Sequence, residues 1–355
     1  MRIALDVTPE LAGFTGIARY SRELGKALER RSDCDVVRFA VGRGKGSVAA
    51  SCRRLRVPLR IVDPMWRVLG FPSARRLVGT VDVVHSLDLR APPTRGALVV
   101  TVHDTVAVEL PRLHSRRAVR AQRWRLAELD RAHAIVAVSQ STADAIVSLG
   151  IDRERIHVAP NGLTALPDPV DPPIPDRRFI LVVGTLEPRK GHALLLRAFA
   201  NAGVRNAGLV FAGPAADRSA ELTALASHLG IRDRLTILGR VDDRVLAGLY
   251  RDAALLCMPS LAEGFGLPVL EAMAAGLPVL ASDLPAVREV AGEAAVRFPA
   301  GDVEALTAAL QRLLADPALL GSLRAAGASR AARFTWEAAA EATVRAYRCA
   351  LAAVR

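Results

Sequence analysis

Residues 254–281 read ALLCMPSLAEGFGLPVLEAMAAGLPVLA and indicate how the second half of the chain folds. The apolar run at the start of this stretch predicts a buried strand, and a loop with two glycines follows it. Leu267 then begins a predicted helix with Pro268 in its first turn, where an N–H group has no helical partner to lose. Gly276 ends that helix, and the apolar residues after it predict the next strand. The stretch is therefore a strand–loop–helix–strand unit.

The start of this predicted helix is a candidate anion-binding site. The first N–H groups of a helix have no partner within it, and the helix dipole places partial positive charge at the same end. Gly264 and Gly266 carry no side chains, so the loop backbone can approach a ligand closely. We therefore expect an anionic group, such as a phosphate, beyond the tip of the strand.

Two glutamates, Glu263 and Glu271, flank the same loop. Their carboxylates would repel a diphosphate, but they can accept hydrogen bonds from hydroxyl groups. A nucleotide sugar offers hydroxyl groups on both sides of its phosphates. At this spacing alone, an exposed loop glutamate and a solvated helix glutamate are the alternative interpretation.

The segment from Glu263 to Val279, EGFGLPVLEAMAAGLPV, resembles the donor-site signature of retaining glycosyltransferases of the GT4 family, which have the GT-B fold. The resemblance covers nearly the whole chain and is strongest from Phe179 to Glu293. It implies an α/β protein in which two Rossmann-like, doubly wound domains face each other across a cleft. It also implies that the chain is an enzyme, a hexosyltransferase.

The resemblance implies a role for each polar group of this loop. Glu263 would be catalytic and, with the backbone of Phe265 and Gly266, would hold hydroxyl groups of the transferred sugar. Glu271 would hold the ribose hydroxyl groups, and nearby amide groups would bind the diphosphate. The donor-binding residues implied here are Gly264, Phe265, Gly266, Leu267 and Glu271.

A second loop, after the predicted strand Phe179–Val183, carries two cations. Lys190 is one of only three lysines among 48 cationic residues, which favours a requirement for a compact point charge at this helix start. A solvated surface lysine is the alternative. The segment resembles the GT4 element whose basic pair, here Arg189 and Lys190, holds the donor diphosphate. Many relatives carry arginine at the position of Thr185. The resemblance therefore supports a role for Lys190 more directly than it supports one for Arg189.

Three further candidates come from other loops. The glycine loop Gly13–Gly16 resembles the GT4 loop whose N–H groups contact the donor phosphates, with Gly16 as the contact. His103 follows a strongly apolar strand and resembles the GT4 histidine beside the transferred sugar. A tight turn and a structural histidine are the alternatives. Resemblance to the GT-B fold also implies that the nucleotide base is bound by backbone groups, and we expect these in the loop that holds Val241.

Strand and helix patterns alternate in both halves of the chain. The predicted strands are Arg2–Asp6, Asp35–Val41, Val81–His85, Ala97–Val102 and Ala134–Val138, then Phe179–Val183, Gly208–Phe211, Leu235–Leu238, Ala254–Met258, Leu277–Ala281 and Ala295–Phe298. The predicted helices of the first half are Ile17–Arg30, Arg116–Arg131 and Ser141–Leu149. A proline-rich linker at 167–175 predicts domains at 1–166 and 176–335. By resemblance to GT-B proteins, a helix at 336–355 returns to the first domain.

Composition agrees with a globular enzyme. The chain has 355 residues, of which 51% are apolar and 24% charged, enough for two domains with buried cores. The first residues hold too short an apolar run for a signal peptide, and no apolar stretch reaches spanning length without a charge or a proline. The four cysteines show neither metal-ligand spacing nor a disulfide pattern. We therefore expect a cytoplasmic protein with no metal and no other cofactor.

Charge is distributed unevenly along the chain. Residues 1–162 hold 27 Lys and Arg against 16 Asp and Glu, whereas the remainder holds 21 against 20. One arginine group crowds a predicted helix, namely Arg112, Arg116, Arg117, Arg120, Arg123, Arg125 and Arg131. Another surrounds Trp66 and Phe71, namely Arg53, Arg54, Arg56, Arg60 and Arg67. A basic face with aromatic residues suits peripheral contact with an anionic membrane or a lipid-diphosphate acceptor, and a solvated arginine-rich face is the alternative.

The expected reaction moves a sugar from a nucleotide donor to an acceptor with retention of configuration. Cations and helix N-termini would stabilise the departing nucleoside diphosphate without a metal. The loop around Lys190 resembles mannosyl- and deoxysugar-transferring relatives, so GDP-mannose is the first donor to test, followed by UDP- and dTDP-sugars. The expected acceptor is a saccharide, a lipid-linked saccharide or a natural product.

Three other functions stay open at this point. A GT-B sugar-nucleotide epimerase or hydrolase would be separated from a transferase by its products. A nucleic-acid-binding protein would use the basic half, but only 4% of the residues are aromatic and no such motif is present. We expect no nucleic-acid partner. A catalytically inactive subunit is disfavoured because Lys190, Glu263 and Glu271 are all present.

Overall fold

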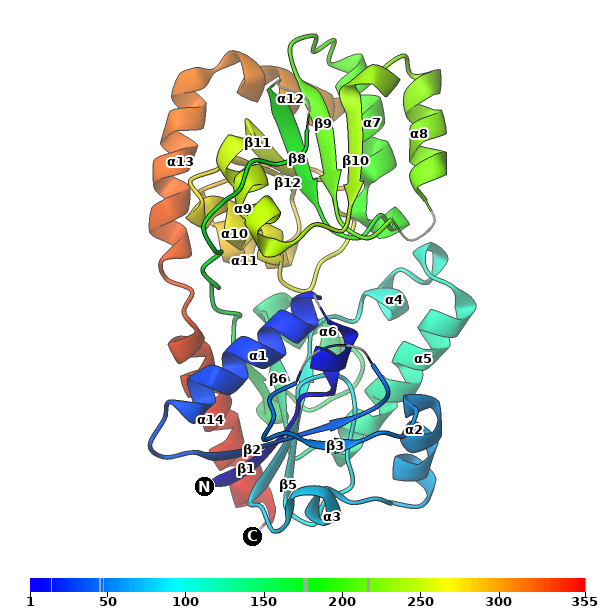
Figure 1. Ribbon diagram of the computed structural model, residues 1–355, viewed down its shortest axis with the longest axis vertical. Coiled ribbons are helices and arrows are strands. Elements are labelled where there is room, and N and C mark those ends of the chain that lie inside the picture. The colour runs from blue at the N-terminus through cyan, green and yellow to red at the C-terminus, as the bar shows by residue number, and fades with distance from the viewer. Residues whose placement is uncertain (14, 45, 47, 175–177, 216–217, 355) are drawn as a thin grey trace. The chain divides into compact units, whose positions relative to one another are not determined.

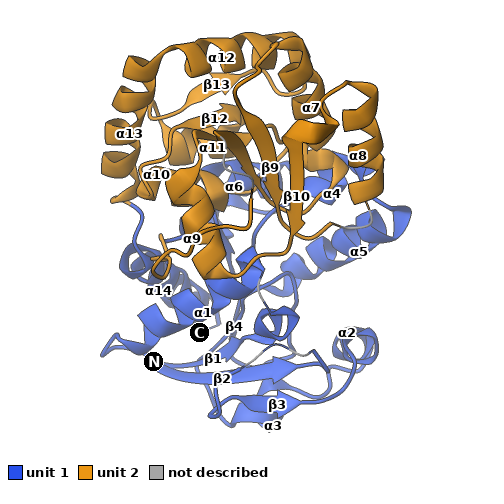
Figure 2. Cartoon of the chain, turned by 45° about the horizontal axis from the view of Figure 1, so that its top comes forward, with its two compact units in different colours: residues 1–162, 334–355 blue, residues 163–333 orange. Residues whose placement is uncertain are grey.

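The computed structural model describes residues 1–13, 15–44, 46, 48–174, 178–215 and 218–354. The chain forms two compact units, one of residues 1–162 with 334–355 and one of residues 163–333 (Figure 2). Each unit contains a parallel sheet with helices on both faces (Figure 1). The predicted α/β fold class, with two doubly wound Rossmann-like domains, is therefore confirmed.

The sheet of unit 1 has, in the described residues, seven parallel strands in the order β3-β2-β1-β4-β5-β6-β7. They are β1 (Arg2–Asp6), β2 (Asp35–Val41), β3 (Arg53–Leu55), β4 (Val83–Ser86), β5 (Ala97–Val102), β6 (Ala134–Ala137) and β7 (Ile156–Val158). Strand β5, an interior strand of this sheet, is buried along its whole length. Strands buried on both faces give the continuous apolar runs from which five of these strands were predicted.

Helices cover both faces of this sheet. They are α1 (Gly16–Glu29), α2 (Leu59–Val68), α3 (Ala74–Val78), α4 (Val106–Glu109), α5 (Arg116–Leu126), α6 (Gln140–Ser148) and α14 (Trp336–Val354), with short 3-10 helices at Thr8–Ala12, Pro111–Leu113, Ala127–Arg131 and Arg153–Arg155. One core cluster joins the sheet to α2, α3 and α6 through Trp66, Val78 and Ile146. The predicted helix Arg116–Arg131 is thus shorter as an α-helix and ends in a 3-10 turn.

Helix α14 closes the other face of unit 1, packing against α1 and strands β4 to β7. The hydroxyl of Tyr347 lies 2.7 Å from Nδ1 of His85, and Nε2 of His85 lies 2.8 Å from Oγ1 of Thr101. A side chain at Gly162 would meet the backbone N of Trp336 at 2.4 Å. The last helix is therefore fastened to unit 1 by a buried polar network and a close backbone contact.

The buried histidines predict how stability depends on pH. Burial lowers the pKa of His85 to about 3 and that of His192 to about 4, against an ordinary value of 6.5. The unfolded chain therefore binds more protons at acidic pH, so stability is complete above the unfolded pKa and is lost as pH falls below it. As the pH falls from about 7 to about 5, each of these histidines should lower the free energy of unfolding by about 2 kcal/mol.

Urea unfolding measured across this range tests the prediction. His85→Gln keeps hydrogen-bonding groups beside Tyr347 and Thr101 but does not titrate, so its stability should fall less steeply on acidification. The comparison with wild type removes the contribution of the carboxylates, which both proteins share. An unchanged slope in His85→Gln would contradict a neutral, buried His85.

The sheet of unit 2 has, among its described residues, six parallel strands in the order β10-β9-β8-β11-β12-β13. They are β8 (Phe179–Val183), β9 (Gly208–Ala212), β10 (Leu235–Gly239), β11 (Leu255–Met258), β12 (Val279–Ser282) and β13 (Val296–Phe298). All six match predicted strands to within two residues at each end. Burial on both faces again explains the apolar runs of β8, β9, β11 and β12, whereas the edge strands β10 and β13 are only partly buried.

The helices of unit 2 alternate with these strands. They are α7 (His192–Asn201), α8 (Ser219–His228), α9 (Asp243–Asp252), α10 (Leu267–Ala274), α11 (Pro285–Ala291), α12 (Val303–Ala315) and α13 (Pro317–Ala331), with 3-10 turns at Pro188–Lys190 and Arg232–Arg234. A core cluster joins α7 and α12 to the sheet through Phe199, Leu310 and Phe211. Helix α10 begins at Leu267, as the sequence predicts, and packs against α13.

The proline-rich segment lies in unit 2 as far as it is described, to residue 174. The backbone N–H of Val170 donates to the carbonyl of Arg244, at a distance of 3.2 Å. A side chain at Gly248 would meet the carbonyl oxygen of Val170 at 2.0 Å. Segment 168–172 therefore runs against helix α9 rather than standing clear of the unit as a linker would.

Candidate functional site

Unit 2 places its predicted site residues at the point where the strand order reverses. Strands β8 and β11 are neighbours, and the chain proceeds from them toward opposite edges of the sheet. Open parallel sheets bind ligands in the crevice that such a reversal leaves at the carboxyl ends of the strands. Lys190 follows β8 and Glu263 follows β11, so the two loops flank this crevice.

Lys190 and Glu263 form an ion pair with a distance of 2.5 Å between Nζ and Oε1. Their side chains are only 12% and 8% exposed, so the alternatives of a solvated lysine and an exposed glutamate are wrong. The hydroxyl of Ser260 donates to the same carboxylate at 2.7 Å. The guanidinium of Arg189 lies 3.8 Å from its other oxygen.

This arrangement keeps Glu263 ionised. Burial alone would raise the pKa of its carboxyl, but the charges of Lys190 and Arg189 and the hydrogen bonds from Lys190 and Ser260 outweigh that effect. The pKa therefore lies below its ordinary value. The carboxylate can accept hydrogen bonds from hydroxyl groups at neutral pH, and Lys190 supplies a positive charge beside it.

A glycine holds the two loops together. Gly191 lies in the left-handed region with φ of +70°, and a side chain there would meet the carbonyl oxygen of Pro259 at 2.0 Å. The N–H of Leu261 donates to the carbonyl of Arg189 at 2.7 Å. The backbone of the β8–α7 loop therefore lies directly against the β11–α10 loop, which brings Lys190 to Glu263.

The loop before α10 has the geometry that its glycines predict. Gly266 has φ of +98° and is the residue at the N-terminal end of the helix, where a side chain would be strained. Phe265 is buried, which anchors the loop, while Gly264 and Leu267 lie on either side of this turn. The first turn of α10 therefore presents its N-terminus at the carboxyl edge of the sheet.

Glu271 is buried at 7% exposure rather than solvated. The hydroxyl of Tyr250, from helix α9, donates to its Oε2 at 2.8 Å. A buried carboxylate held by a buried tyrosine is positioned rather than mobile. The alternative of a solvated helix glutamate is therefore wrong at this position as well.

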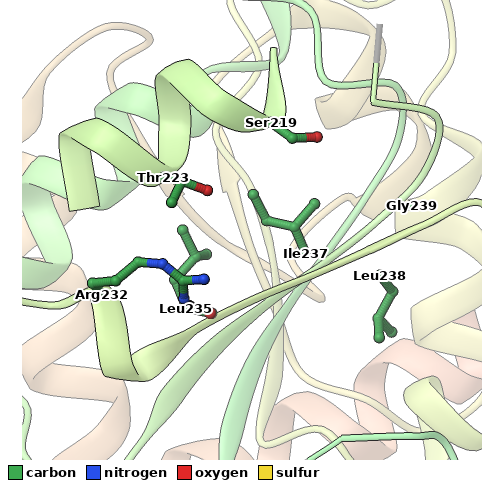
Figure 3. A pocket seen from close by; sticks show the side chains of 7 residues that line it. All are labelled: Ser219, Thr223, Arg232, Leu235, Ile237, Leu238 and Gly239. Carbon is green, nitrogen blue, oxygen red and sulfur yellow. Dashed lines mark hydrogen bonds between the residues drawn. The ribbon is translucent and has the colours of Figure 1, made fainter. Parts of the chain in front are cut away.

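Val241 follows edge strand β10, two residues after Gly239. A cavity of about 380 Å³ lies between β10 and α8, and Gly239 is part of its lining. Figure 3 shows Ser219 and Thr223 on α8 facing Ile237 of β10. The lining contains none of the predicted site residues, so this cavity is separate from the Lys190–Glu263 pair.

Unit 1 has its own reversal of strand order, between neighbouring strands β1 and β4. His103 follows β5, beside β4, and a cavity of about 290 Å³ lies against it. The polar side chains lining this cavity are Asp88, His103, Asp104, Gln122 and Arg125. Apolar residues, among them Ile17 and Leu89, complete the wall.

The ring of His103 has a defined orientation. Its Nε2 lies 3.0 Å from the carbonyl oxygen of Leu87, an acceptor, so Nε2 carries the proton and Nδ1 is left as an acceptor. Tyr20 packs edge-on against the ring, with 4.7 Å between ring centroids. Burial lowers the pKa of His103 despite the backbone hydrogen bond and the nearby Asp88, so the imidazole is neutral at pH 7.

Gly16 is exposed and is the first residue of α1. Thr15 precedes it and caps the helix, accepting a hydrogen bond from the N–H of Ala18 at 3.1 Å. Phe14 of the same loop lies outside the described residues. The loop therefore ends at a helix N-terminus, the arrangement on which its proposed contact with phosphate depends.

Comparison with known proteins identifies the family. Residues 168–331 match the family model "Glycosyl transferases group 1", and residues 14–165 match "Glycosyltransferase Family 4". A D-inositol 3-phosphate glycosyltransferase from Nocardia farcinica is 33% identical over 79% of this chain and 69% of its own length. The chain belongs to glycosyltransferase family 4.

Two other similar proteins cover almost all of this glycosyltransferase. An O-antigen chain mannosyltransferase B from Escherichia coli is 27% identical over 98% of the chain and 100% of its own length. The structure of a sucrose-phosphate synthase from Thermosynechococcus elongatus has a TM-score of 0.79, with 25% identity and 98% coverage of both chains. The GT-B fold and a transferase activity are thus established for this chain.

Several residues that complete the site of this glycosyltransferase were missed in the sequence. Ser260 and Tyr250 donate to predicted residues, Gly191 lies against the carbonyl of Pro259, and Asp88 lines the cavity beside His103. Gly191 directly follows Lys190, a local signal that could have pointed to it. No local signal marks Tyr250, which reaches Glu271 from a helix 21 residues away in sequence.

Proposed function

We propose that this glycosyltransferase transfers a mannosyl residue from GDP-mannose to a saccharide acceptor, with retention of configuration and without a metal ion. The mannose assignment rests on the full-length similarity to a mannosyltransferase and on the loop around Lys190. UDP- and dTDP-sugars are the next donors to test. A cytoplasmic location is proposed as well, and the four free cysteines support a reducing compartment.

The Lys190–Glu263 pair is the observation that carries the proposal. In the absence of a donor the two charges neutralise each other in a mostly buried position. A nucleotide sugar offers each a better partner, because its diphosphate is anionic and its sugar carries hydroxyl donors. On binding, Lys190 would turn to a phosphate oxygen while Glu263 would accept from a sugar hydroxyl. The two residues would therefore contact the groups on either side of the bond that breaks, the diphosphate and the sugar.

The same groups stabilise the leaving group in the proposed mechanism. As the bond between the sugar and the diphosphate lengthens, negative charge grows on the phosphate oxygens. Lys190, Arg189 and the N-terminus of α10 would meet that charge, which is electrostatic stabilisation in a preorganised site. The acceptor hydroxyl attacks the face from which the diphosphate departs, and a phosphate oxygen takes its proton.

In unit 1, the cavity beside His103 is our candidate for a sugar-binding site. Nδ1 of His103 is a hydrogen-bond acceptor. Burial alone would raise the pKa of Asp88, but the charge of Arg90 leads the effects that outweigh it. The pKa is therefore lowered and the carboxylate is ionised. Both groups accept hydrogen bonds from hydroxyl groups. The apolar wall formed by Ile17 and Leu89 suits the ring face of a sugar.

Calorimetric titration with GDP, UDP, dTDP and their sugar conjugates, with a chelator present throughout, tests the donor proposal. We expect GDP and GDP-mannose to bind without metal, with affinities little changed when the chelator is replaced by magnesium. Tight binding only with magnesium would contradict metal independence. Binding of UDP or dTDP alone would replace the donor assignment.

Product analysis tests the reaction itself. With GDP-mannose and an acceptor glycan, nuclear magnetic resonance of the product should show an α-linked mannose, the anomer of the donor. A β-linked product would contradict retention. Free mannose or a rearranged nucleotide sugar as the main product would instead indicate a hydrolase or an epimerase.

A further inference from the structure

The region 53–81 of unit 1 forms an exposed surface that the catalytic proposal does not use. It contains seven arginines and a single acidic residue, Asp63. That carboxylate lies within ion-pair distance of Arg90 and Arg125, at 3.8 Å and 3.6 Å, and is 15% exposed. Of the seven arginines, Arg67 pairs with Glu128 at 3.2 Å, and the others leave the outer surface of the region basic.

Helix α2 has two distinct faces in this region. Val62 and Trp66, four residues apart, point into the core, and Trp66 is only 3% exposed. The sequence-based placement of Trp66 on a basic surface is therefore wrong. Ile61 and Val68, seven residues apart, lie together on the outer face beside Arg60 and Arg67.

The turn that follows α2 exposes further apolar side chains. Val68 is 78% exposed, Leu69 68% and Phe71 43%. The guanidinium of Arg76, in α3, lies 5.0 Å from the centroid of the Phe71 ring. Figure 1 shows α2 and α3 at the margin of unit 1, following edge strand β3. We call this surface, made of Arg60, Ile61, Arg67, Val68, Leu69, Phe71, Arg75 and Arg76, the α2–α3 surface.

We propose that the α2–α3 surface binds an anionic lipid membrane. Val68, Leu69 and Phe71 would enter the interface between headgroups and acyl chains, and the arginines would contact anionic headgroups. None of the described helices is both long and apolar enough to cross a bilayer. The membrane contact proposed here is therefore peripheral.

Charge decides between this partner and a second copy of the chain. A symmetric dimer through the α2–α3 surface would bring two strongly basic faces together, and like charges repel. An anionic membrane complements the arginines and also takes up the apolar side chains. Nucleic acid complements the arginines and could stack a base on Phe71, but Val68 and Leu69, the most exposed apolar side chains of the surface, offer no ring for a base.

Co-flotation of the full chain with vesicles tests the proposal. Vesicles of phosphatidylcholine containing one third phosphatidylglycerol should bind the chain, vesicles of phosphatidylcholine alone should bind it weakly, and high salt should weaken binding. Arg75→Glu/Arg76→Glu and Val68→Ser/Leu69→Ser should each weaken binding on the order of ten-fold or more.

Matched controls separate the α2–α3 surface from general charge and hydrophobicity. Arg205→Glu/Arg312→Glu in unit 2 changes the net charge equally, and Val147→Ser/Leu149→Ser removes two exposed apolar residues elsewhere in unit 1. Both controls should bind vesicles like wild type. All four variants should bind nucleotide normally, because none of these residues belongs to the proposed donor site.

Four results would overturn the proposal. The first two are failure of the wild type to bind anionic vesicles and a loss of vesicle binding in the control variants as large as in the test variants. The third is a dimer in solution that Val68→Ser/Leu69→Ser dissociates. The fourth is displacement of the chain from vesicles by low concentrations of RNA. The dimer would assign the surface to a second copy, and the displacement would assign it to nucleic acid.

Discussion

Replacing Glu263 with glutamine is expected to lower kcat/KM for sugar transfer by a factor on the order of 10² to 10³. The amide keeps the size of the side chain and an oxygen that can accept from Ser260, but it loses the charge that orders Lys190 at 2.5 Å. Lys190→Met should cause a comparable loss, because it removes the cation proposed to meet the leaving diphosphate. Steady-state kinetics with the donor identified by calorimetry measure both effects.

The double variant decides whether the two residues act as a unit. If Lys190 and Glu263 work together, Glu263→Gln/Lys190→Met should be no more than a few-fold slower than either single variant. Losses that multiply would contradict a shared function. Glu221→Gln is the matched control, since this carboxylate forms an equally short ion pair with Arg218 but is 62% exposed on α8. Its transfer rate should equal that of wild type.

Burial of the pair means that stability must be measured beside activity. Removing one partner of a buried ion pair leaves the other charge uncompensated, at a cost of about 3 to 5 kcal/mol. In Lys190→Met, Glu263 would keep only Arg189, 3.8 Å away, as a cationic partner, so its carboxyl would protonate more readily. The double variant removes both charges and should recover most of that stability. Unchanged activity in Glu263→Gln would contradict the site assignment, whatever its stability.

The fold could be predicted where burial of an element requires apolar residues in its own sequence. The strands of both sheets that are buried on both faces read as apolar runs, and β5 is the clearest case. Strands β3 and β7 were missed because each has three residues at a sheet edge. Residues 53–55 are Arg-Arg-Leu, which is not an apolar run. This segment is a strand because it pairs with β2, not because its own residues favour one.

The candidate site could be predicted in its residue types but not in its contacts. Local sequence identified both residues, Glu263 from the glycine loop that follows it and Lys190 from the rarity of lysine in this chain. Their ion pair joins residues 73 positions apart, and nothing in either motif indicates that the carboxylate neutralises the cation. Trp66 shows the opposite error, because its arginine-rich surroundings in sequence concealed a helix face that points into the core.

Gly191→Ala is expected to destabilise unit 2 and lower transfer together. A non-glycine residue in the left-handed region costs about 1 kcal/mol. The added methyl would also meet the carbonyl oxygen of Pro259 at 2.0 Å, which no adjustment of a side chain can relieve. The two loops must separate, which breaks the bond between Leu261 and Arg189 and draws Lys190 away from Glu263.

Gly203→Ala is the control that isolates the backbone strain. Gly203 has φ of +65° at the other end of α7, and a side chain there meets no atom of the described residues within 4 Å. It should therefore lose only about 1 kcal/mol in urea unfolding and keep its transfer rate. Gly191→Ala should lose about 3 kcal/mol or more, with kcat/KM reduced roughly ten-fold or more. Equal behaviour of the two variants would show that contact between the loops does not position Lys190, and the pair would then owe its geometry to Ser260 and Arg189 alone.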